Sequence, residues 1–132
     1  MTIAVTLYLL SLTQTGIVVV TKWPGWAILL IGGLGVIIGN VANFAWLCNL
    51  LLIASWALLI DKKSGRAVLC SVAALLGAAL FLLCQTVVVS EGGGPGYHID
   101  SVGPGYWLWL GSMLVTVLAS SVAMAEEARQ VG

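Results

Sequence analysis

The sequence is poor in charge, and its charged residues are absent from its long apolar stretches. Only 8% of its 132 residues are charged, five basic and five acidic, whereas 61% are hydrophobic. A soluble domain carries about 25% charged residues. So short a chain has a large surface for its volume, and it could not bury this many hydrophobic side chains away from water. With a formal net charge of 0 and no basic stripe, nucleic-acid binding has no electrostatic basis. The composition predicts a protein that is dissolved in a lipid bilayer.

The groups that membrane enzymes and pumps use are also missing from the apolar stretches. A proton-coupled exporter needs a carboxylate within the membrane, but no Asp or Glu lies there, and Gln14 occupies the middle of the first stretch. Cys48, Cys70 and Cys84 form no C-x-x-C pair and are interpreted as small buried hydrophobes, with acylation of Cys70 as an alternative. The single histidine, His98, lies in a loop, whereas haem ligands and a hydrolase base must be buried beside their partners. We predict no enzymatic activity, catalytic residue, metal or cofactor.

Four apolar stretches reach the length of a spanning helix, for which about 17 residues is the lower limit. They cover residues 2–20, 44–60, 67–89 and 106–125. The first stretch has no basic start and no small-x-small cleavage site, so it is predicted to be a retained span and not a signal peptide. The predicted fold class is all-α: a polytopic transmembrane helical bundle that forms a single domain over residues 1–132.

Basic and aromatic residues indicate the same orientation for this bundle. Lys62, Lys63 and Arg66 lie in the short loop 61–66, which the positive-inside rule places in the cytoplasm. Both termini then lie inside, and the loop 90–105 lies outside. Trp and Tyr prefer the headgroup level, and most of them fall at the outer face in this arrangement. The predicted interfacial anchors are Trp23, Trp26, Trp46, Tyr97, Tyr106, Trp107 and Trp109.

Residues 26–39 are apolar but too short for a full span, and they show no polar face. We therefore predict a re-entrant or interfacial segment that dips into the membrane from the outer side. Its glycines fall on one side of a helix, where they allow the close approach of a neighbouring helix. These predicted helix-packing residues are Gly25, Gly32, Gly35 and Gly39.

A five-span alternative remains open, in which residues 23–41 cross the membrane completely. Asn40 would then end one helix in a left-handed conformation, and Asn43 would cap the next. This arrangement moves the N-terminus outside and Lys22 inside, so that every basic residue is cytoplasmic. It also requires a hairpin of only two or three residues between two full spans, so four spans plus the outer segment are preferred.

The loop 90–105 and its boundary contain the tetrapeptide Gly-Pro-Gly-Tyr twice. Pro followed by Gly suits a type II turn, and two such turns would fold the loop into a compact outer cap. We interpret these residues as turns and anchors that close the bundle, with a recognition loop for an external partner as the alternative. The residues concerned are Gly94, Pro95, Tyr97, His98, Asp100, Gly103, Pro104 and Tyr106.

Polar residues inside the apolar stretches are predicted to join helices. Ser112, Thr116 and Ser120 repeat every fourth residue on the last span, a spacing typical of helix–helix contacts. Buried amides need hydrogen-bond partners, which we expect on neighbouring helices or on a second subunit. The intramembrane amides are Gln14, Asn40, Asn43 and Asn49.

The stretch GWAILLIGGLGVIIGNVANFAWLCNLLLIASWALL and the later segments SEGG and GPGYWLWLGS resemble a loose group of uncharacterised small four-span bacterial inner-membrane proteins. The pattern of this group is a G-W segment, a W-x-x-N helix, a short basic loop and a G-Y-x-L-W-L segment that opens the last span. This chain differs where the group often has Asn-Pro, since Leu50 follows Asn49. The resemblance implies an inner-membrane location and four spans, and it implies no chemistry.

Three functions remain compatible with these residues. The first is a non-enzymatic accessory subunit that packs within a larger membrane complex or a homo-oligomer, because the chain is rich in packing surfaces and lacks a catalytic set. The alternative is a small oligomeric channel or carrier for a neutral solute, with Asn40, Asn43 and Asn49 at its mouth. The third is a regulatory or immunity-type membrane protein that captures an external ligand with the loop 90–105.

Overall fold

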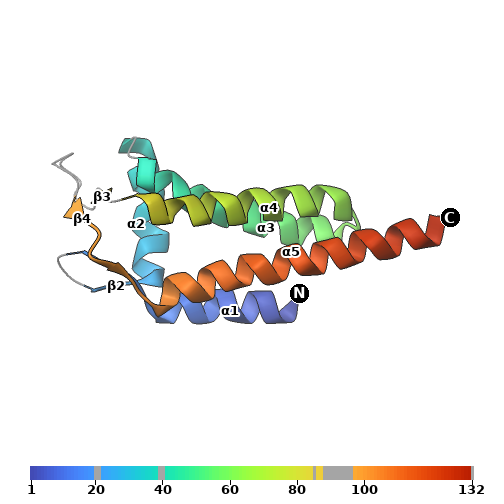
Figure 1. Cartoon of the computed structure of the whole chain (residues 1–132), viewed down its shortest axis with the longest axis horizontal. Helices are drawn as coiled ribbons and strands as arrows, with labels where there is room; N and C mark the ends of the chain where they lie inside the picture. Colours follow the sequence, from blue (N-terminus) through green and yellow to red (C-terminus); the bar gives the residue numbers. More distant parts are fainter. Residues whose placement is uncertain (20–21, 39–40, 85, 88–96, 132) are drawn as a thin grey trace.

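The described part of the chain consists of five α-helices, two 3₁₀ helices and short strands (Figure 1). The structure is a computed structural model that describes residues 1–19, 22–38, 41–84, 86–87 and 97–131. The helices are α1 (Thr2–Thr13), α2 (Gly25–Ile38), η1 (Val41–Trp46), α3 (Leu47–Ile60), α4 (Ser64–Leu80), η2 (Phe81–Leu83) and α5 (Pro104–Val131). The strands are β1 (Thr15–Val18), β2 (Lys22–Pro24), β3 (Thr86–Val87), β4 (Tyr97–His98) and β5 (Ser101–Val102).

Some residues named above lie outside the described residues. They are Gly39, Asn40, Gly94 and Pro95, together with the side chains of Asn43 and Tyr97.

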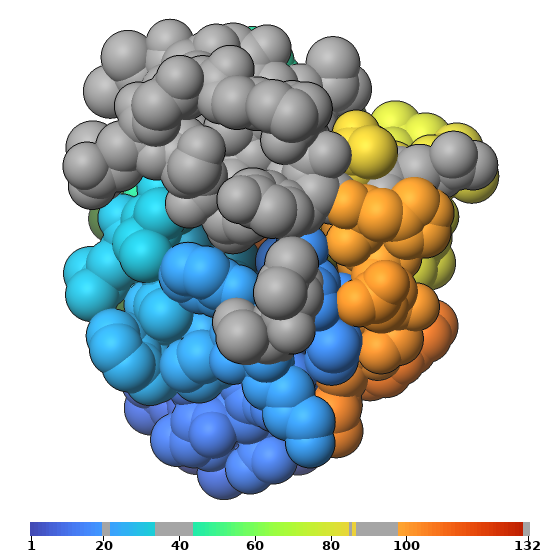
Figure 2. Space-filling model, turned by 90° about the vertical axis from the view of Figure 1, so that its left-hand side faces the viewer, coloured from blue at the N-terminus to red at the C-terminus, as the bar shows by residue number. Residues whose placement is uncertain are grey.

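Helices α1, α3, α4 and α5 run alongside one another, and α2 lies across one end of this bundle (Figure 1). The strands lie at the same end as α2. The N-terminus, the α3–α4 turn that contains Lys62 and Lys63, and the C-terminus lie towards the opposite end. Seen from the α2 end, the N-terminal hairpin (blue) lies between α2 (cyan) and the segment that leads into α5 (orange) (Figure 2). The basic turn and the strands therefore occupy opposite ends of the molecule.

The prediction of four spans is met only in part. Two helical segments of the described chain are long and apolar enough to cross a membrane, Ser64–Leu83 and Pro104–Gln130. Two others, Thr2–Thr13 and Phe44–Ile60, are apolar but shorter. At 1.5 Å per residue α1 is about 18 Å long, less than the hydrocarbon thickness of about 30 Å. The described chain is mainly helical, as predicted, but the prediction of an all-α fold holds only in part because short strands form a three-stranded and a two-stranded sheet.

The first predicted span is wrong in its second half, where the chain forms a strand. Thr13 Oγ1 donates a hydrogen bond to Leu10 O at 2.8 Å, and Gln14 is extended, with φ −99° and ψ 163°. The β-branched residues that follow favour a strand. Strand β1 pairs antiparallel with both β2 and β5, in the order β2-β1-β5, with Ile17 opposite Val102. The hairpin therefore replaces the second half of a spanning helix.

Other predicted boundaries shift for similar local reasons. Helix α4 begins at Ser64, and after η2 the chain becomes extended, so that Thr86 pairs with His98 in a second sheet. Pro104 is the first residue of α5, because the fixed φ of proline suits the first helical position. The second Gly-Pro-Gly-Tyr is thus the start of a helix and not a separate type II turn.

The five-span alternative does not match this arrangement. Helix α2 has 14 residues, and it lies across the bundle and not along it (Figure 1). Met1 and the C-terminal turn of α5 both lie away from the α2 end (Figure 1). The two ends of a chain lie on the same side when it runs along the bundle an even number of times, whereas five spans would place them on opposite sides.

Candidate functional site

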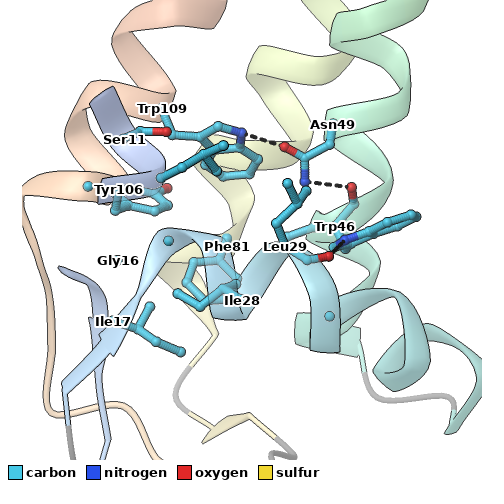
Figure 3. Close-up of a pocket in the computed structure, with 15 residues that line it drawn as sticks. Ser11, Gly16, Ile17, Ile28, Leu29, Trp46, Asn49, Phe81, Tyr106 and Trp109 are labelled. Carbon is cyan, nitrogen blue, oxygen red and sulfur yellow. Dashed lines mark hydrogen bonds between the residues drawn. The ribbon is translucent and has the colours of Figure 1, made fainter. Parts of the chain in front are cut away.

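Asn49, near the start of α3, joins three helices through its side-chain amide. Figure 3 shows its hydrogen bonds to Trp109 and Trp46. Its Oδ1 accepts hydrogen bonds from Trp109 Nε1 of α5 at 2.9 Å and from Tyr8 Oη of α1 at 3.3 Å. Its Nδ2 donates to Trp46 O at 3.0 Å. Asn49 is 8% exposed, and these bonds supply the partners that a buried amide needs. The side chain of Asn49 therefore links α1 and α5 to α3 within one chain.

The chemistry of its partners fixes which way the Asn49 amide points. An indole N–H can only donate, so the atom that faces Trp109 must be the oxygen. A backbone carbonyl can only accept, so the atom that faces Trp46 O must be the nitrogen. Trp46 is held in turn, because its Nε1 donates to Leu29 O of α2 at 2.6 Å. This chain of hydrogen bonds connects the crosswise helix α2 to the bundle.

A cavity of about 110 Å³ lies beside Asn49, at the end of the bundle that α2 covers (Figure 3). Its wall combines apolar side chains, aromatic rings and the bare backbone of several glycines, and none of its lining residues is charged. Residues from α1, β1, α2, η1, α3, η2 and α5 contribute to it. They are Ser11, Leu12, Gly16, Ile17, Gly25, Ile28, Leu29, Gly32, Ala45, Trp46, Asn49, Phe81, Gly105, Tyr106 and Trp109.

At the wall of the cavity, the first residues of α2 and α5 meet the last turn of α1. A Cβ added to Gly25 would collide with Ser11 O, and one added to Gly105 would lie 2.8 Å from the same oxygen. Gly25 N also donates to Gln14 O at 2.8 Å. The N-terminal ends of two helices thus face the carboxyl end of a third, which is the favourable sense for helix dipoles. Only glycine permits an approach this close.

The predicted glycine stripe of α2 lies partly against the protein itself. Gly25 contacts α1, and a Cβ on Gly32 would lie 2.7 Å from Trp46 Cδ1. The neighbouring Gly33, which the stripe did not include, faces the same indole, with Cζ2 at 3.2 Å from an added Cβ. Gly35 is helical, and Gly39 lies outside the described residues.

The hydroxyl groups of α5 form a buried seam against α3 and α4. Ser112, Thr116 and Ser120 are at most 1% exposed. Trp56 Nε1 of α3 donates to Thr116 Oγ1 at 3.0 Å, and Ser71 Oγ of α4 lies 3.2 Å from Ser120 Oγ. Each hydroxyl of the seam also donates to a backbone carbonyl of its own helix. The seam therefore holds the helices of one chain together.

The predicted interfacial anchors divide into two groups. Trp26 and Trp107 are exposed, at 56% and 54%, and Trp23 is half-buried. In contrast Trp46, Tyr106 and Trp109 direct their polar atoms into the protein, and Tyr106 Oη donates to Ala78 O at 2.6 Å. These three side chains therefore bond to the bundle itself and not to lipid headgroups.

The remaining predicted residues lie apart from the cavity or at its edge. His98 and Asp100 are exposed, and Asp100 N donates to Val18 O at 2.9 Å. Gly103 is buried against Thr15, and its N–H donates to Gly16 O at 2.8 Å. Gln14 is exposed, and within the described part of the chain its Nε2 donates to Thr13 Oγ1 at 3.4 Å. Among the described residues the side chain of Gln14 bonds to no neighbouring helix, because α1 ends immediately before it. A partner for Gln14 on a second subunit stays a prediction.

Sequence reasoning missed several partners of the buried polar groups. Tyr8 and Trp56 were not singled out, although their rings make an edge contact with centroids 5.7 Å apart. Ser64, the first residue of α4, donates to Glu127 Oε1 of α5 at 2.6 Å. The helical spacing of Ala4, Tyr8 and Ser11, which are the buried residues of α1, was the signal that could have identified Tyr8.

The described residues define a helical bundle that is held by interhelical polar contacts and contains a small, uncharged cavity at one end. Comparisons with protein-family models, with curated proteins and with solved structures gave no match to this chain.

Proposed function

We propose that the protein is a small, non-enzymatic integral membrane protein of the bacterial inner membrane. Its role is that of an accessory subunit, which packs within a larger membrane complex or a homo-oligomer. The observation that carries this proposal is the distribution of side chains, with large apolar groups outside the bundle and hydroxyl groups inside it.

The exterior of the described helices is apolar along the length of the bundle. Large aliphatic side chains on all four long-axis helices are each at least 49% exposed: Leu9, Leu50, Ile53, Leu69, Leu76, Leu80, Leu114 and Leu118. Ser55, Ser71, Ser112 and Ser120 are 0% exposed. In a soluble protein hydroxyl side chains are mostly exposed, and so large an apolar surface marks contact with lipid or with other proteins. A lipid bilayer around the bundle explains both the exposed aliphatic side chains and the buried hydroxyl groups.

The position of the charged residues agrees with an inner-membrane orientation. The turn that contains Lys62 and Lys63 lies at the same end as the C-terminal turn of α5, which contains Arg129. The strands and α2 lie at the other end. The positive-inside rule favours the basic end as cytoplasmic, so we propose that residues 61–66 and the C-terminus lie in the cytoplasm. In this proposal α1 and α3 cross the membrane together with α4 and α5, which gives four spans. Because α1 and α3 are shorter, the β1–β2 hairpin and η1 occupy the rest of the membrane thickness on the outer side.

A subunit role is favoured over a channel through one chain by the packing of the bundle interior. Leu52 of α3 and Met113 of α5 are both 0% exposed and belong to the same core cluster as Ala74 and Ala78. Interiors packed in this way leave few voids larger than a water molecule. Most polar side chains of this interior contact a polar group on another helix, as Trp56 does with Thr116 and Ser71 with Ser120. Among the described residues the buried Ser55 hydroxyl alone has no hydrogen-bond partner, so no continuous polar path runs through the interior.

Helix α2 offers the surface that a partner would cover. One side of it rests on Trp46 through Gly32, whereas Trp26, Leu30 and Ile31 are 56%, 68% and 39% exposed. The helix contains no charged residue and does not run along the bundle. An apolar surface at this position suits an apolar helix of another subunit.

Site-specific photocrosslinking in native membranes tests the subunit role. A photoreactive residue at Leu30 should give a discrete protein adduct, whereas the same residue at Leu69, which is 71% exposed on α4, should react with lipid alone. An adduct at twice the 13.8 kDa of the chain would identify a homo-oligomer, and another discrete mass would identify a larger complex. The absence of any protein adduct from position 30, at equal expression, would contradict the proposal.

A further inference from the structure

The cavity beside Asn49 has an uncharged wall with a strongly apolar character. Ile28, Leu29 and Phe81 contribute aliphatic and aromatic surface, and Gly16 contributes bare backbone (Figure 3). Gly32 also lines the wall with bare backbone. A charged molecule would lose its hydration without gaining a counter-ion at this wall. The wall therefore selects against ions and favours a neutral, largely apolar molecule.

Asn49 provides one hydrogen-bond donor at the cavity that the described residues leave unused. A carboxamide has two N–H donors and an oxygen with two acceptor sites. The oxygen accepts from Trp109 and Tyr8, and one N–H is used on Trp46 O. The second N–H has no partner among the residues that the structure describes, although Asn49 is 8% exposed. A buried donor without an acceptor is unfavourable, so a bound molecule that supplies an acceptor is favoured at this point.

Few polar groups of the wall remain free to hold a water molecule in the apolar part of this cavity. Buried waters make about three hydrogen bonds, and empty apolar cavities remain dry and accept small apolar molecules. The Ser11 hydroxyl, which also lines the wall, already donates to Tyr8 O at 2.6 Å. The indole N–H groups of Trp46 and Trp109 are likewise used within the protein.

We propose that this cavity binds a small neutral molecule with an apolar body and one hydrogen-bond acceptor, which takes the second N–H of Asn49. The cavity of about 110 Å³ is somewhat smaller than the engineered cavity of about 150 Å³ in another protein that accepts benzene. The ligand is therefore a compact ring, or the end of a chain, of no more than benzene size. The proposal is independent of the subunit role, because no part of the wall has to contact a partner.

Cyclopentanone is a suitable probe, because it has a compact ring and a single acceptor. The whole purified chain in detergent is titrated with it, and binding is followed through a saturable change in tryptophan fluorescence, to which Trp46 and Trp109 at the cavity wall contribute. The substitutions Trp26→Phe and Trp107→Phe, at two exposed positions, remove the emission of the two tryptophans that the ketone can reach from solution. The infrared carbonyl band of the bound ketone reports on the hydrogen bond. We expect saturable binding and a carbonyl band at lower frequency than in an alkane solvent.

Ala45→Leu is the variant that fills the cavity, since Ala45 lines it. It should weaken cyclopentanone binding at least tenfold while the circular dichroism spectrum stays unchanged. If this variant does not fold, Ala45→Val fills less space and should give a smaller loss of affinity. Ala123→Leu, on α5 and outside the cavity lining, is the matched control and should bind like the wild type.

Three outcomes would overturn the proposal. They are the absence of saturable binding to the wild type, equal binding to the filled variant, and a bound ketone whose carbonyl band stays at its alkane frequency. None of these outcomes bears on the crosslinking result at Leu30.

Discussion

Replacing Gly105 by alanine should lower the free energy of unfolding by about 3 kcal/mol, the upper end of the usual cost of overpacking. The added Cβ would lie 2.8 Å from Ser11 O and 2.9 Å from both Gln14 O and Thr15 O. All three oxygens belong to the backbone, so no side-chain rotation relieves the contact. The start of α5 must therefore shift away from the end of α1, which also alters the cavity that Gly105 lines. Unfolding by sodium dodecyl sulfate in mixed micelles, followed by circular dichroism, measures the loss.

Gly111→Ala is the matched control in the same helix. The nearest atom outside its own helix to a Cβ at Gly111 is Leu7 Cδ1 at 4.0 Å, an ordinary contact. Alanine is a better helix former than glycine by about 0.5–1 kcal/mol, so this variant should be as stable as the wild type or slightly more stable. Equal effects of the two substitutions would show that the contact between the ends of α1 and α5 is not tight.

Replacing Asn49 by leucine should lower the free energy of unfolding by about 2 kcal/mol. Leucine has a similar size, but it leaves the Trp109 indole and the Tyr8 hydroxyl without the acceptor that both use. An unsatisfied buried donor costs about 1–3 kcal/mol in water-soluble proteins, whereas polar contacts between membrane helices average about 0.6 kcal/mol each. The expected value lies between these limits because several bonds are lost together.

A double-mutant cycle separates the hydrogen bond from the change in packing. Trp109→Phe removes the indole N–H while it keeps an aromatic ring beside the amide. With this variant as background, Asn49→Leu should cost about 1 kcal/mol less than in the wild type. Additive effects of the two substitutions would contradict the assignment of Asn49 as the acceptor for α5.

The mainly helical architecture of the chain could be predicted from the sequence, whereas the lengths of its helices could not. Charge is excluded from whole stretches of chain, and that exclusion is visible without any structure. Residues 2–20 look like one span because mean hydropathy does not distinguish a helix from a strand. The break after Thr13 depends on the pairing of Ile17 with Val102, a contact between distant parts of the chain that no local pattern contains.

The candidate site illustrates the same limit. Asn49 was predicted to need partners because of its type and its apolar surroundings. Its partners Tyr8 and Trp109 lie 41 and 60 positions away in sequence, so their identity follows only from the packing of α1 and α5. The spacing of Ser112, Thr116 and Ser120 predicted a contact with another helix. The sequence did not show that this helix belongs to the same chain, as the contacts with Trp56 and Ser71 reveal. This finding shifts the proposed partner surface to the exposed side of α2.

Spin-label accessibility tests the central claim, that the apolar exterior of the bundle faces lipid. Single cysteines at Leu69 and Leu118, which are 71% and 59% exposed, would be labelled in a background without Cys48, Cys70 and Cys84 and reconstituted into vesicles. We predict frequent collisions with oxygen and rare collisions with a water-soluble nickel chelate at both positions. A label at Lys62, in the charged turn, provides the aqueous reference. Collision rates with the nickel chelate at Leu69 and Leu118 as high as those at Lys62 would contradict the account.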